Sequence, residues 1–282
     1  NHFEEFRDID YLPDTGSKRV LTTGGHFGYL KIAEGCDKHC TYCIIPKLRG
    51  KFRSVPMERL IAQAEDMAEQ GVKELILVAQ ETTVYGKDLY GKKSLHILLK
   101  KLCEIRGIRW IRILYCYPEE IYDELIETIR DEKKICHYLD IPIQHASDRI
   151  LKRMGRRTSK QELIDIVGKL RKEIPDIVLR TTLITGFPGE TEEDHEELKE
   201  FVDEMEFDRL GVFTYSPEEN TPAAEMADQV PEEVKEERRD ELMELQQEIS
   251  YDRGQDRIGQ ELLVMIEGKV ADESAYIGRT YG

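Results

Sequence analysis

Three cysteines near the start of the chain have the spacing of ligands that share one group. Cys36, Cys40 and Cys43 form the pattern C-x₃-C-x₂-C within the segment GCDKHCTYC. The remaining cysteines are Cys103, Cys116 and Cys136. None of these continues the spacing, so a group held by the first three would keep one position open for another ligand.

Three kinds of site could use this pattern. A structural zinc ion usually takes four ligands, and His39 would be an awkward fourth because it lies between two of the cysteines. A thioredoxin-like pair needs only C-x₂-C, which leaves Cys36 unexplained. A 4Fe–4S cluster held by three thiolates keeps one iron free, a variation on the usual four-cysteine sites. Spacing and location favour the cluster, and zinc remains the alternative.

Composition limits the class of protein. The 282 residues are 40% hydrophobic and 35% charged, with a formal charge of −16, which is typical of a globular chain. No apolar run approaches the length of a membrane span, and the first residues lack the order of a secretory signal. Six cysteines then indicate a reducing compartment, and we expect a cytoplasmic protein. The missing initiator methionine predicts that the chain is part of a longer protein.

The negative charge also bears on the partner. Binding along a nucleic acid requires clustered lysine and arginine, so the balance of 57 acidic to 41 basic residues argues against a broad nucleic-acid face. It fits a basic protein partner better. Simple solubility is the competing explanation, because net charge governs solubility and association rather than identity.

Strands and helices alternate along most of the chain. The sequence predicts strands at residues 27–35, 73–80, 109–118, 137–144, 176–189 and 209–217. It predicts helices at residues 57–70, 94–105, 119–132, 160–173, 191–205 and 232–253. This order predicts βαβ units and a parallel α/β sheet. Six units are too few for an ordinary eight-fold barrel, so we expect an open or partial barrel with its chemistry at the carboxyl ends of the strands.

The cysteine pattern, with Tyr42 just before the last cysteine, resembles the radical S-adenosylmethionine (SAM) superfamily. The resemblance implies a partial (β/α)₆ barrel and a 4Fe–4S cluster on Cys36, Cys40 and Cys43. In that superfamily the free iron binds SAM, and an electron cleaves SAM to a 5′-deoxyadenosyl radical that abstracts hydrogen from a C–H bond. The cofactors carry this chemistry, and the protein orients them and excludes water.

Longer motifs resemble the methylthiotransferases, which replace C–H by C–S–CH₃. They are GCDKHCTYCIIPKLRGKFRS, DIPIQHASDRILKRMGR, TLITGFPGETEED and TYSPEENTPAA. The resemblance implies a linker at residues 1–24, a radical SAM domain at 25–253 and part of a TRAM domain, a small β-barrel, at 254–282. It also implies an amino-terminal domain with a second 4Fe–4S cluster. That domain is not in this sequence, so we expect SAM cleavage without sulfur transfer.

Two branches of that family modify different substrates, a tRNA adenosine or an aspartate of ribosomal protein S-twelve in the small subunit. The segments AQETTVYG, LYCYPEE and IQHASDR resemble the branch that modifies the β-carbon of the aspartate. An acidic enzyme and a basic ribosomal protein also have complementary charge. We therefore expect a basic ribosomal protein substrate, a reductant such as flavodoxin or ferredoxin, and no tRNA or membrane partner. The tRNA branch and a zinc-stabilised binding module remain alternatives.

The resemblance also implies contacts to SAM, and it assigns no side chain a catalytic role. The residues predicted to bind the cofactor are Tyr42, Gln80, Glu81, Gln144, Ser147, Arg157, Gly186 and Phe187. Gln80 and Glu81 would lie near the amino group of SAM, and Gln144 and Ser147 near its ribose. An ordinary exposed turn is the alternative for Gln80 and Glu81.

Three further predictions concern the later motifs. Arg157, together with Arg156, could bind the SAM carboxylate or an acidic substrate through paired N–H donors, or could belong to a solvated turn. Gly186 would let the backbone approach the adenine, or could simply make a turn. His145 is equally consistent with a buried structural histidine.

Overall fold

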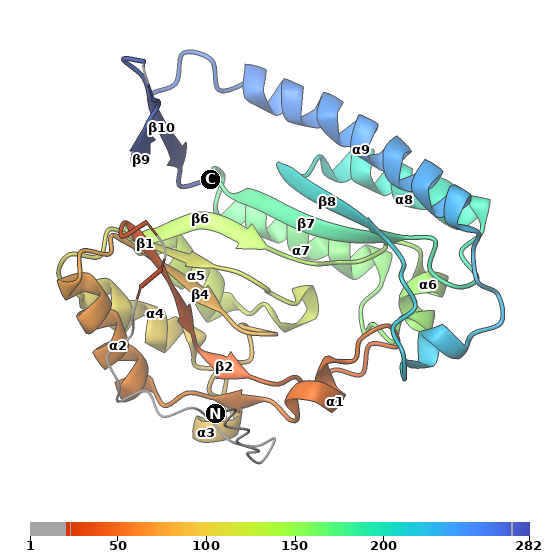
Figure 1. Cartoon of the computed structure of the whole chain (residues 1–282), viewed down its shortest axis with the longest axis horizontal. Coiled ribbons are helices and arrows are strands. Elements are labelled where there is room, and N and C mark those ends of the chain that lie inside the picture. Colours follow the sequence, from red (N-terminus) through yellow and green to blue (C-terminus); the bar gives the residue numbers. More distant parts are fainter. Residues whose placement is uncertain (1–20, 23, 272) are drawn as a thin grey trace, which may run out of the picture.

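The computed structural model describes residues 21–22, 24–271 and 273–282, so nearly all of the linker predicted for residues 1–24 lies outside them. In the described part, six parallel strands form the main sheet (Figure 1). Its strands, in spatial order, are β1 (Phe27–Lys31), β4 (Glu74–Val78), β5 (Trp110–Ile113), β6 (Ile135–Asp140), β7 (Val178–Thr185) and β8 (Arg209–Thr214). The spatial order follows the chain order. This confirms the predicted parallel α/β sheet.

Helices connect consecutive strands. They include α2 (Met57–Glu69), α4 (Leu95–Glu104), α5 (Asp123–Asp131), α7 (Lys160–Glu173) and α8 (Glu192–Met205). Parallel crossovers are right-handed, and a strand order that never reverses therefore puts all connections on one face of the sheet. Strands β1 and β8 pair with one neighbour each in the described chain, so the sheet is open. A long helix, α9 (Glu232–Gln255), lies beside β8 and α8.

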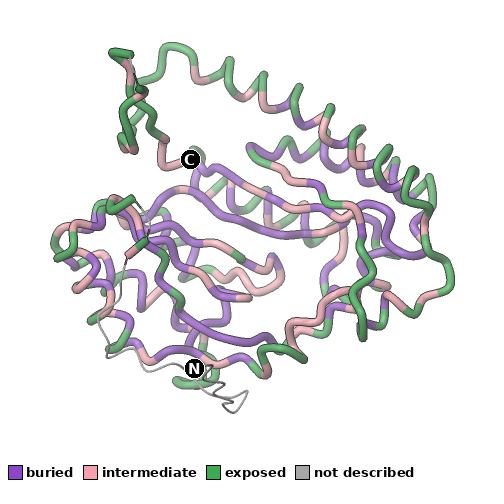
Figure 2. The backbone as a smooth tube through the Cα atoms, in the orientation of Figure 1, coloured by how far each residue is buried: buried purple, intermediate pink, exposed green. Residues whose placement is uncertain are grey.

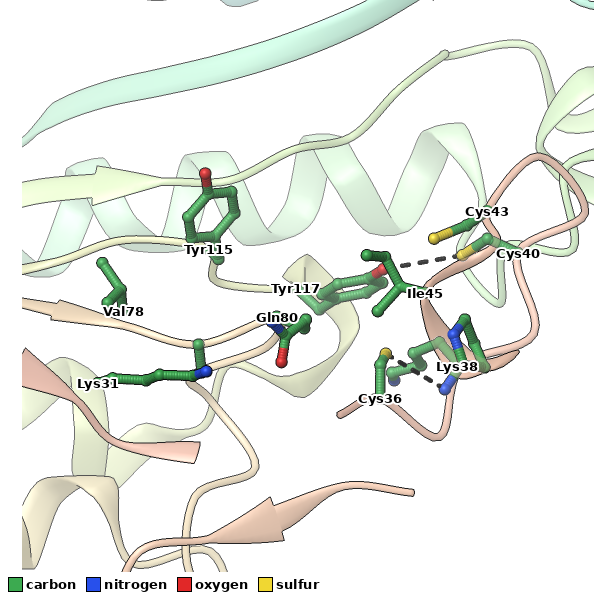
Figure 3. Close-up of a pocket in the computed structure, with 12 residues that line it drawn as sticks. Lys31, Cys36, Lys38, Cys40, Cys43, Ile45, Val78, Gln80, Tyr115 and Tyr117 are labelled. Carbon is green, nitrogen blue, oxygen red and sulfur yellow. Dashed lines mark hydrogen bonds between the residues drawn. The ribbon is translucent and has the colours of Figure 1, made fainter. Parts of the chain in front are cut away.

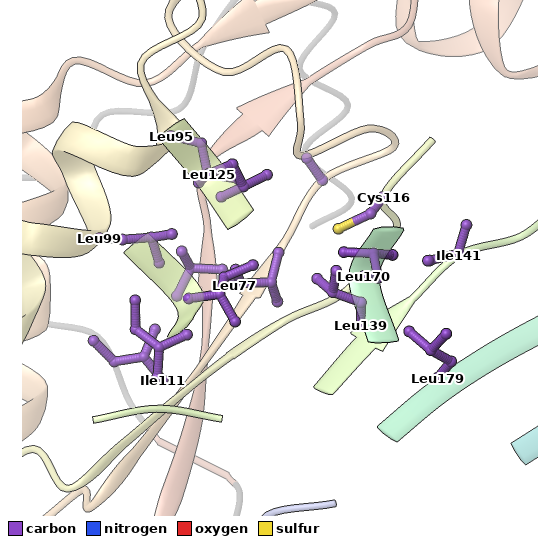
Figure 4. Packing of buried hydrophobic residues seen from close by; sticks show 14 of the residues in the cluster. Leu77, Leu95, Leu99, Ile111, Cys116, Leu125, Leu139, Ile141, Leu170 and Leu179 are labelled. Carbon is purple, nitrogen blue, oxygen red and sulfur yellow. The ribbon is translucent and has the colours of Figure 1, made fainter. Parts of the chain in front are cut away.

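The core lies between the sheet and its helices, where the buried segments of Figure 2 run side by side. Helix α4 buries Leu95, Leu98, Leu99 and Leu102, which recur at the spacing of one helical face. These leucines share the core with strand residues such as Leu77 (Figure 4). The packed core fixes the strand ends, and with them the loops at the carboxyl edge.

All six strands are shorter than predicted, and two of them differ for an identifiable reason. The segment 27–35 divides into β1 and β2 (Ala33–Glu34), and β2 pairs with β3 (Arg53–Ser54) outside the main sheet. The segment 109–118 ends as a strand at Ile113, because Tyr115 takes a φ of +58°, which extended strands do not use.

Four short elements were not predicted from the sequence. They are β3, α1 (Ile45–Arg49), α3 (Lys87–Tyr90) and α6 (Asp148–Arg153). Each is too short to show a helical or strand period.

The end of the chain forms a small hairpin. Strands β9 (Val264–Lys269) and β10 (Tyr276–Thr280) pair in antiparallel fashion, which fits the predicted β-rich tail. The assignment of this tail to a TRAM domain stays a prediction. Across the described ranges, no helix has both the length and the apolar character that a membrane crossing requires.

Candidate functional site

The three clustered cysteines face one cavity at the carboxyl edge of the sheet (Figure 3). The cavity has a volume of about 380 Å³, within the usual range of small-molecule sites. Its lining residues are Lys31, Cys36, Lys38, Cys40, Cys43, Ile45, Pro46, Val78, Ala79, Gln80, Tyr115 and Tyr117. The predicted location of the cysteine loop, after the first strand and at the sheet's carboxyl edge, is therefore confirmed.

Backbone hydrogen bonds hold the cysteine loop in place. The Thr41 N–H donates to Met154 O at 2.9 Å, and its hydroxyl donates to Arg153 O at 2.8 Å. At the start of the loop, the Cys36 N–H donates to Gly50 O at 3.2 Å. The loop is thus tied both to the end of α6 and to its own return segment.

One glycine lets these segments approach. Gly155 has a φ of +73°, and a Cβ atom there would lie 2.8 Å from His39 O in the cysteine loop. Any other residue would be strained in conformation and would push the loop away. No motif in the sequence indicates this contact.

Burial makes two of the clustered thiols harder to deprotonate. Burial raises the pKa of Cys36 to about 11 and also raises the pKa of Cys43. All six cysteines are free, with no disulfide among the described residues. Binding a metal group would have to displace the thiol protons.

The arrangement bears on the zinc alternative. Within the described ranges, no three His, Cys, Asp or Glu side chains are grouped to hold a single metal ion. In a cubane cluster each thiolate binds a different iron atom, so its ligands stand farther apart than those of one ion. Three thiols that line one cavity are compatible with a cluster, and zinc remains the alternative.

Gln80 and Glu81 diverge after β4. Gln80 lines the cysteine cavity, and its Oε1 atom finds no hydrogen-bond partner in the described part of the chain. Glu81 instead lines a second, smaller cavity with Lys38 and Arg157. Its carboxylate lies 3.8 Å from Lys38 Nζ, and burial raises its pKa to about 7. The two residues predicted together thus face different cavities.

Two residues at neighbouring strand ends have left-handed backbones. Tyr115 follows β5 with a φ of +58°, and Gln144 follows β6 with a φ of +73°. Such conformations are uncommon outside glycine and gather at functional sites. Tyr115 lines the cysteine cavity, whereas Gln144 is outside its lining. A ribose contact by Gln144 stays a prediction.

Ser147 has a structural partner. Its hydroxyl donates to Asp194 Oδ1 at 2.7 Å, and the residue is 2% exposed. Its N–H donates to Nδ1 of the fully buried His145 at 3.0 Å, and the other ring nitrogen lies 3.5 Å from Glu190. Ser147 and His145 thus both have partners within the protein, and the ribose contact of Ser147 stays a prediction.

The residues of the predicted adenine segment pack behind Tyr42. Phe187 is fully buried, and its ring meets the rings of Tyr42 and Tyr215 edge to face. Gly186 has a φ of +67°, and a Cβ atom there would collide with the side chain of Lys235 from α9. The glycine therefore accommodates α9, and Phe187 supports Tyr42; neither lines the cysteine cavity.

The two adjacent arginines differ in burial. Arg157, the residue assigned to SAM, is exposed and lines the smaller cavity. The side chain of Arg156 is fully buried, and its guanidinium stacks on the ring of Tyr117. Sequence reasoning treated the pair as equivalent and missed Tyr117, although Tyr115 and Tyr117, two residues apart after a strand, could have indicated a shared face.

Comparison with known proteins identifies the family. Residues 30–202 match the model of the Radical SAM superfamily, which is more than half of the chain. The chain therefore belongs to this superfamily. The expected fold class agrees with this assignment.

Curated relatives share more than half of their aligned residues with this chain. The chain is 68% identical over 278 residues to the ribosomal protein uS12 methylthiotransferase RimO of Lachnoclostridium phytofermentans, covering 99% of this chain and 63% of that protein. It is 57% identical to RimO of Clostridium perfringens, covering 93% of this chain and 59% of the relative. The chain thus spans about three fifths of the length of these relatives.

Solved structures support the fold. Coproporphyrinogen III oxidase HemN of Escherichia coli, described as a radical SAM enzyme, aligns with a TM-score of 0.61 and 19% identity, covering 79% of this chain and 53% of that chain. The radical SAM methyltransferase TsrM of Kitasatospora setae, solved with cobalamin and a [4Fe-4S] cluster, aligns with a TM-score of 0.59 and 16% identity, covering 70% and 38%.

Proposed function

We propose that this chain is the radical SAM part of a methylthiotransferase that acts on ribosomal protein uS12. The observation that carries the proposal is the 68% identity to a uS12 methylthiotransferase across 99% of the chain. The target would be the β-carbon of an aspartate, as the sequence motifs imply. The cysteine cavity at the carboxyl edge of the sheet supplies a site for the chemistry.

The residues around the cavity fit a 4Fe–4S cluster and SAM. Cys36, Cys40 and Cys43 line one cavity, and three thiolates would leave one iron of the cluster free for SAM. Gln80 offers a buried acceptor, unpartnered within the described chain, to a donor such as the ammonium group of SAM. When bound, the cluster would pass an electron to SAM and so provide a radical able to abstract hydrogen. Tyr42, supported by Phe187, would form the apolar wall beside the cluster.

The substrate would reach the cavity from the open face of the sheet. Tyr115 is 47% exposed and stands at this entrance. Lys31, from the edge strand β1, also lines the cavity, and about half of its side chain is exposed. Its charge would attract an acidic side chain, although it is shared with Glu34. A protruding loop of the substrate, rather than a flat surface, would fit this entrance.

The decisive experiment is a transfer assay on the whole protein. Anaerobically reconstituted protein would be mixed with dithionite, SAM and a uS12 peptide carrying the target aspartate, and mass spectrometry would follow the peptide. We expect a methylthio group on the aspartate and 5′-deoxyadenosine in the mixture. The 282-residue chain alone should form 5′-deoxyadenosine without modifying the peptide. Absence of both products in the whole protein would refute the proposal.

A tRNA substrate is tested by its salt dependence. Each phosphate contact steepens the loss of affinity with rising salt, and this chain has an acidic balance of 57 to 41. We therefore expect weak tRNA binding and measurable uS12 binding at physiological salt. Four basic residues after the cysteines, Lys47, Arg49, Lys51 and Arg53, could serve a phosphate backbone. Tight and steeply salt-dependent tRNA binding in a filter assay would favour the tRNA branch instead.

A further inference from the structure

A fully buried arginine lies directly behind the cysteine cavity. Arg156 follows α6, the helix whose end is bonded to the cysteine loop. Its Nη2 donates to Pro142 O at 3.0 Å, while its Nε and Nη1 atoms have no hydrogen-bond partner among the described residues. Buried charged groups are normally fully paired, so this guanidinium requires an explanation.

The nearest carboxylate neutralises this charge only in part. Glu119 Oε2 lies 3.8 Å from Arg156 Nη2, which is beyond hydrogen-bond distance. The other oxygen of the same carboxylate faces Lys38, 3.7 Å away. An arginine remains charged under all ordinary conditions. The protein thus keeps a positive charge in a poorly solvated position beside the cavity.

Tyr117 connects this charge to a cysteine. The centre of the Arg156 guanidinium lies 4.3 Å from the centroid of the Tyr117 ring. On the cavity side, the Tyr117 hydroxyl lies 3.7 Å from Cys40 Sγ, a contact marked in Figure 3. The Tyr117 hydroxyl can donate to a Cys40 thiolate from this position.

We propose that Arg156, acting through Tyr117, positions the Cys40 sulfur and stabilises the reduced form of the cluster. The inference rests on the proposed function, since it requires the cluster. Reduction adds one electron, taken from an external one-electron donor, and so adds one negative charge near Cys40. A fixed positive charge favours that state, because screening is weak where water is excluded. Hydrogen bonds to cluster sulfurs and burial are established determinants of reduction potential.

The adjacent residue provides a matched control. Arg157 has the same charge and is one position along the chain, but it is exposed. Water and salt screen an exposed charge far more than a buried one. Arg156→Gln and Arg157→Gln change the net charge by the same amount. The two variants differ in whether the removed charge is buried or exposed.

The test is a redox titration of the reconstituted cluster, followed by electron paramagnetic resonance. We expect Arg156→Gln to lower the midpoint potential by at least 59 mV, a tenfold shift of a one-electron equilibrium. Arg157→Gln should leave the potential of the cluster, measured in the absence of SAM, unchanged. Arg156→Lys, which keeps the charge, should recover most of the difference. Tyr117→Phe should lower the potential by losing the donor to Cys40.

The outcomes separate this inference from the proposed function. If the wild-type protein binds a cluster and cleaves SAM, but the potentials of the Arg156→Gln and Tyr117→Phe variants equal that of the wild type, the inference is wrong and the function stands. Equal shifts in the two arginine variants would also overturn it. If Arg156→Gln fails to assemble a cluster, Tyr117→Phe decides the question. A wild-type protein without a cluster would overturn the inference and the function together.

Discussion

Buried polar side chains at the two ends of the sheet differ in the hydrogen bonds that they make within the protein. At the amino ends of the strands, the fully buried Glu74 accepts hydrogen bonds from Arg112 and from Arg279 of the terminal hairpin. Arg112 also donates to Tyr281 O at 2.9 Å, while its Nη2 atom has no hydrogen-bond partner among the described residues. At the carboxyl ends, Gln80 Oε1 and two nitrogens of Arg156 have no hydrogen-bond partner in the described ranges.

The difference separates stability from function. A carboxylate that receives several charged donors is held in one arrangement, and such networks tie segments together. Here the network joins β4 and β5 to a hairpin some 170 to 200 residues later in the chain. Unpartnered buried groups lower stability, and a bound ligand is one reason for keeping them. The amino end is therefore a structural closure, and the carboxyl end, which holds the cysteine cavity, is the candidate site.

The largest effect is expected from the cysteines. Replacing any one of Cys36, Cys40 or Cys43 by alanine should abolish the cluster's visible absorbance and all reductive SAM cleavage, because each thiolate would hold a separate iron. The fold should persist, since these residues lie on a loop at the edge of the sheet. Absorbance, 5′-deoxyadenosine and circular dichroism together check this.

Cys103 provides the control for these variants. It lies in α4, outside the cavity lining. Cys103→Ala should retain both the absorbance and SAM cleavage. Continued formation of 5′-deoxyadenosine by a variant that lacks all three clustered cysteines would exclude the assigned cluster site.

A substitution at the amino ends of the strands should lower stability and leave cluster binding unchanged. Glu74→Ala would leave Arg112 and Arg279 without their shared carboxylate, and removing one partner of a buried pair costs about 3–5 kcal/mol. We expect urea denaturation to show a loss of this order, while the surviving folded protein takes up its cluster normally. A stable variant with impaired cluster binding would contradict the separation of the two ends.

The sequence predicted most of this architecture. The helix at Lys160–Glu173 has the predicted bounds, because a capping box at Ser159 and Glu162 and a regular apolar face define it locally. The three cysteines were predictable for the same reason, since their spacing is local. The strand order followed from the alternation of strands and helices.

What the sequence missed depends on distant contacts. Nothing within the motif containing Arg156 and Arg157 indicates which arginine is buried, because Tyr117 lies on another strand end. Likewise the motif around Gly186 does not indicate its contact with Lys235 of α9, and its approach to adenine stays a prediction. These residues acquire their roles only when the sheet brings separate segments together.

Glu81 should make the stability of the protein depend on pH. Burial raises the pKa of this carboxyl group from 4.5 to about 7, so folding takes up a proton between those values. The free energy of unfolding should therefore fall as pH rises from 4.5 to 7, by about 3 kcal/mol at most. Glu81→Gln lacks this group, and its stability should decline less over that range. Urea titrations of the cluster-free protein at pH 5 and pH 8 would test this, and parallel declines would rule it out.

Gln80 should give the smallest and most specific effect. Gln80 lines the cavity, and its Oε1 atom accepts no hydrogen bond from the described residues. A hydrogen bond from a charged donor such as the SAM ammonium group would contribute about 1.5 kcal/mol or more. Gln80→Leu should therefore weaken SAM binding to the reconstituted protein by about tenfold in equilibrium dialysis. The ligand-free protein should lose no stability, because the substitution removes a buried acceptor that protein groups leave unsatisfied. Gln255→Leu, at the exposed end of α9, should change neither quantity. If Gln80→Leu lowered stability but left the SAM affinity unchanged, Gln80 would have a structural role, as Glu74 has at the opposite end of the sheet.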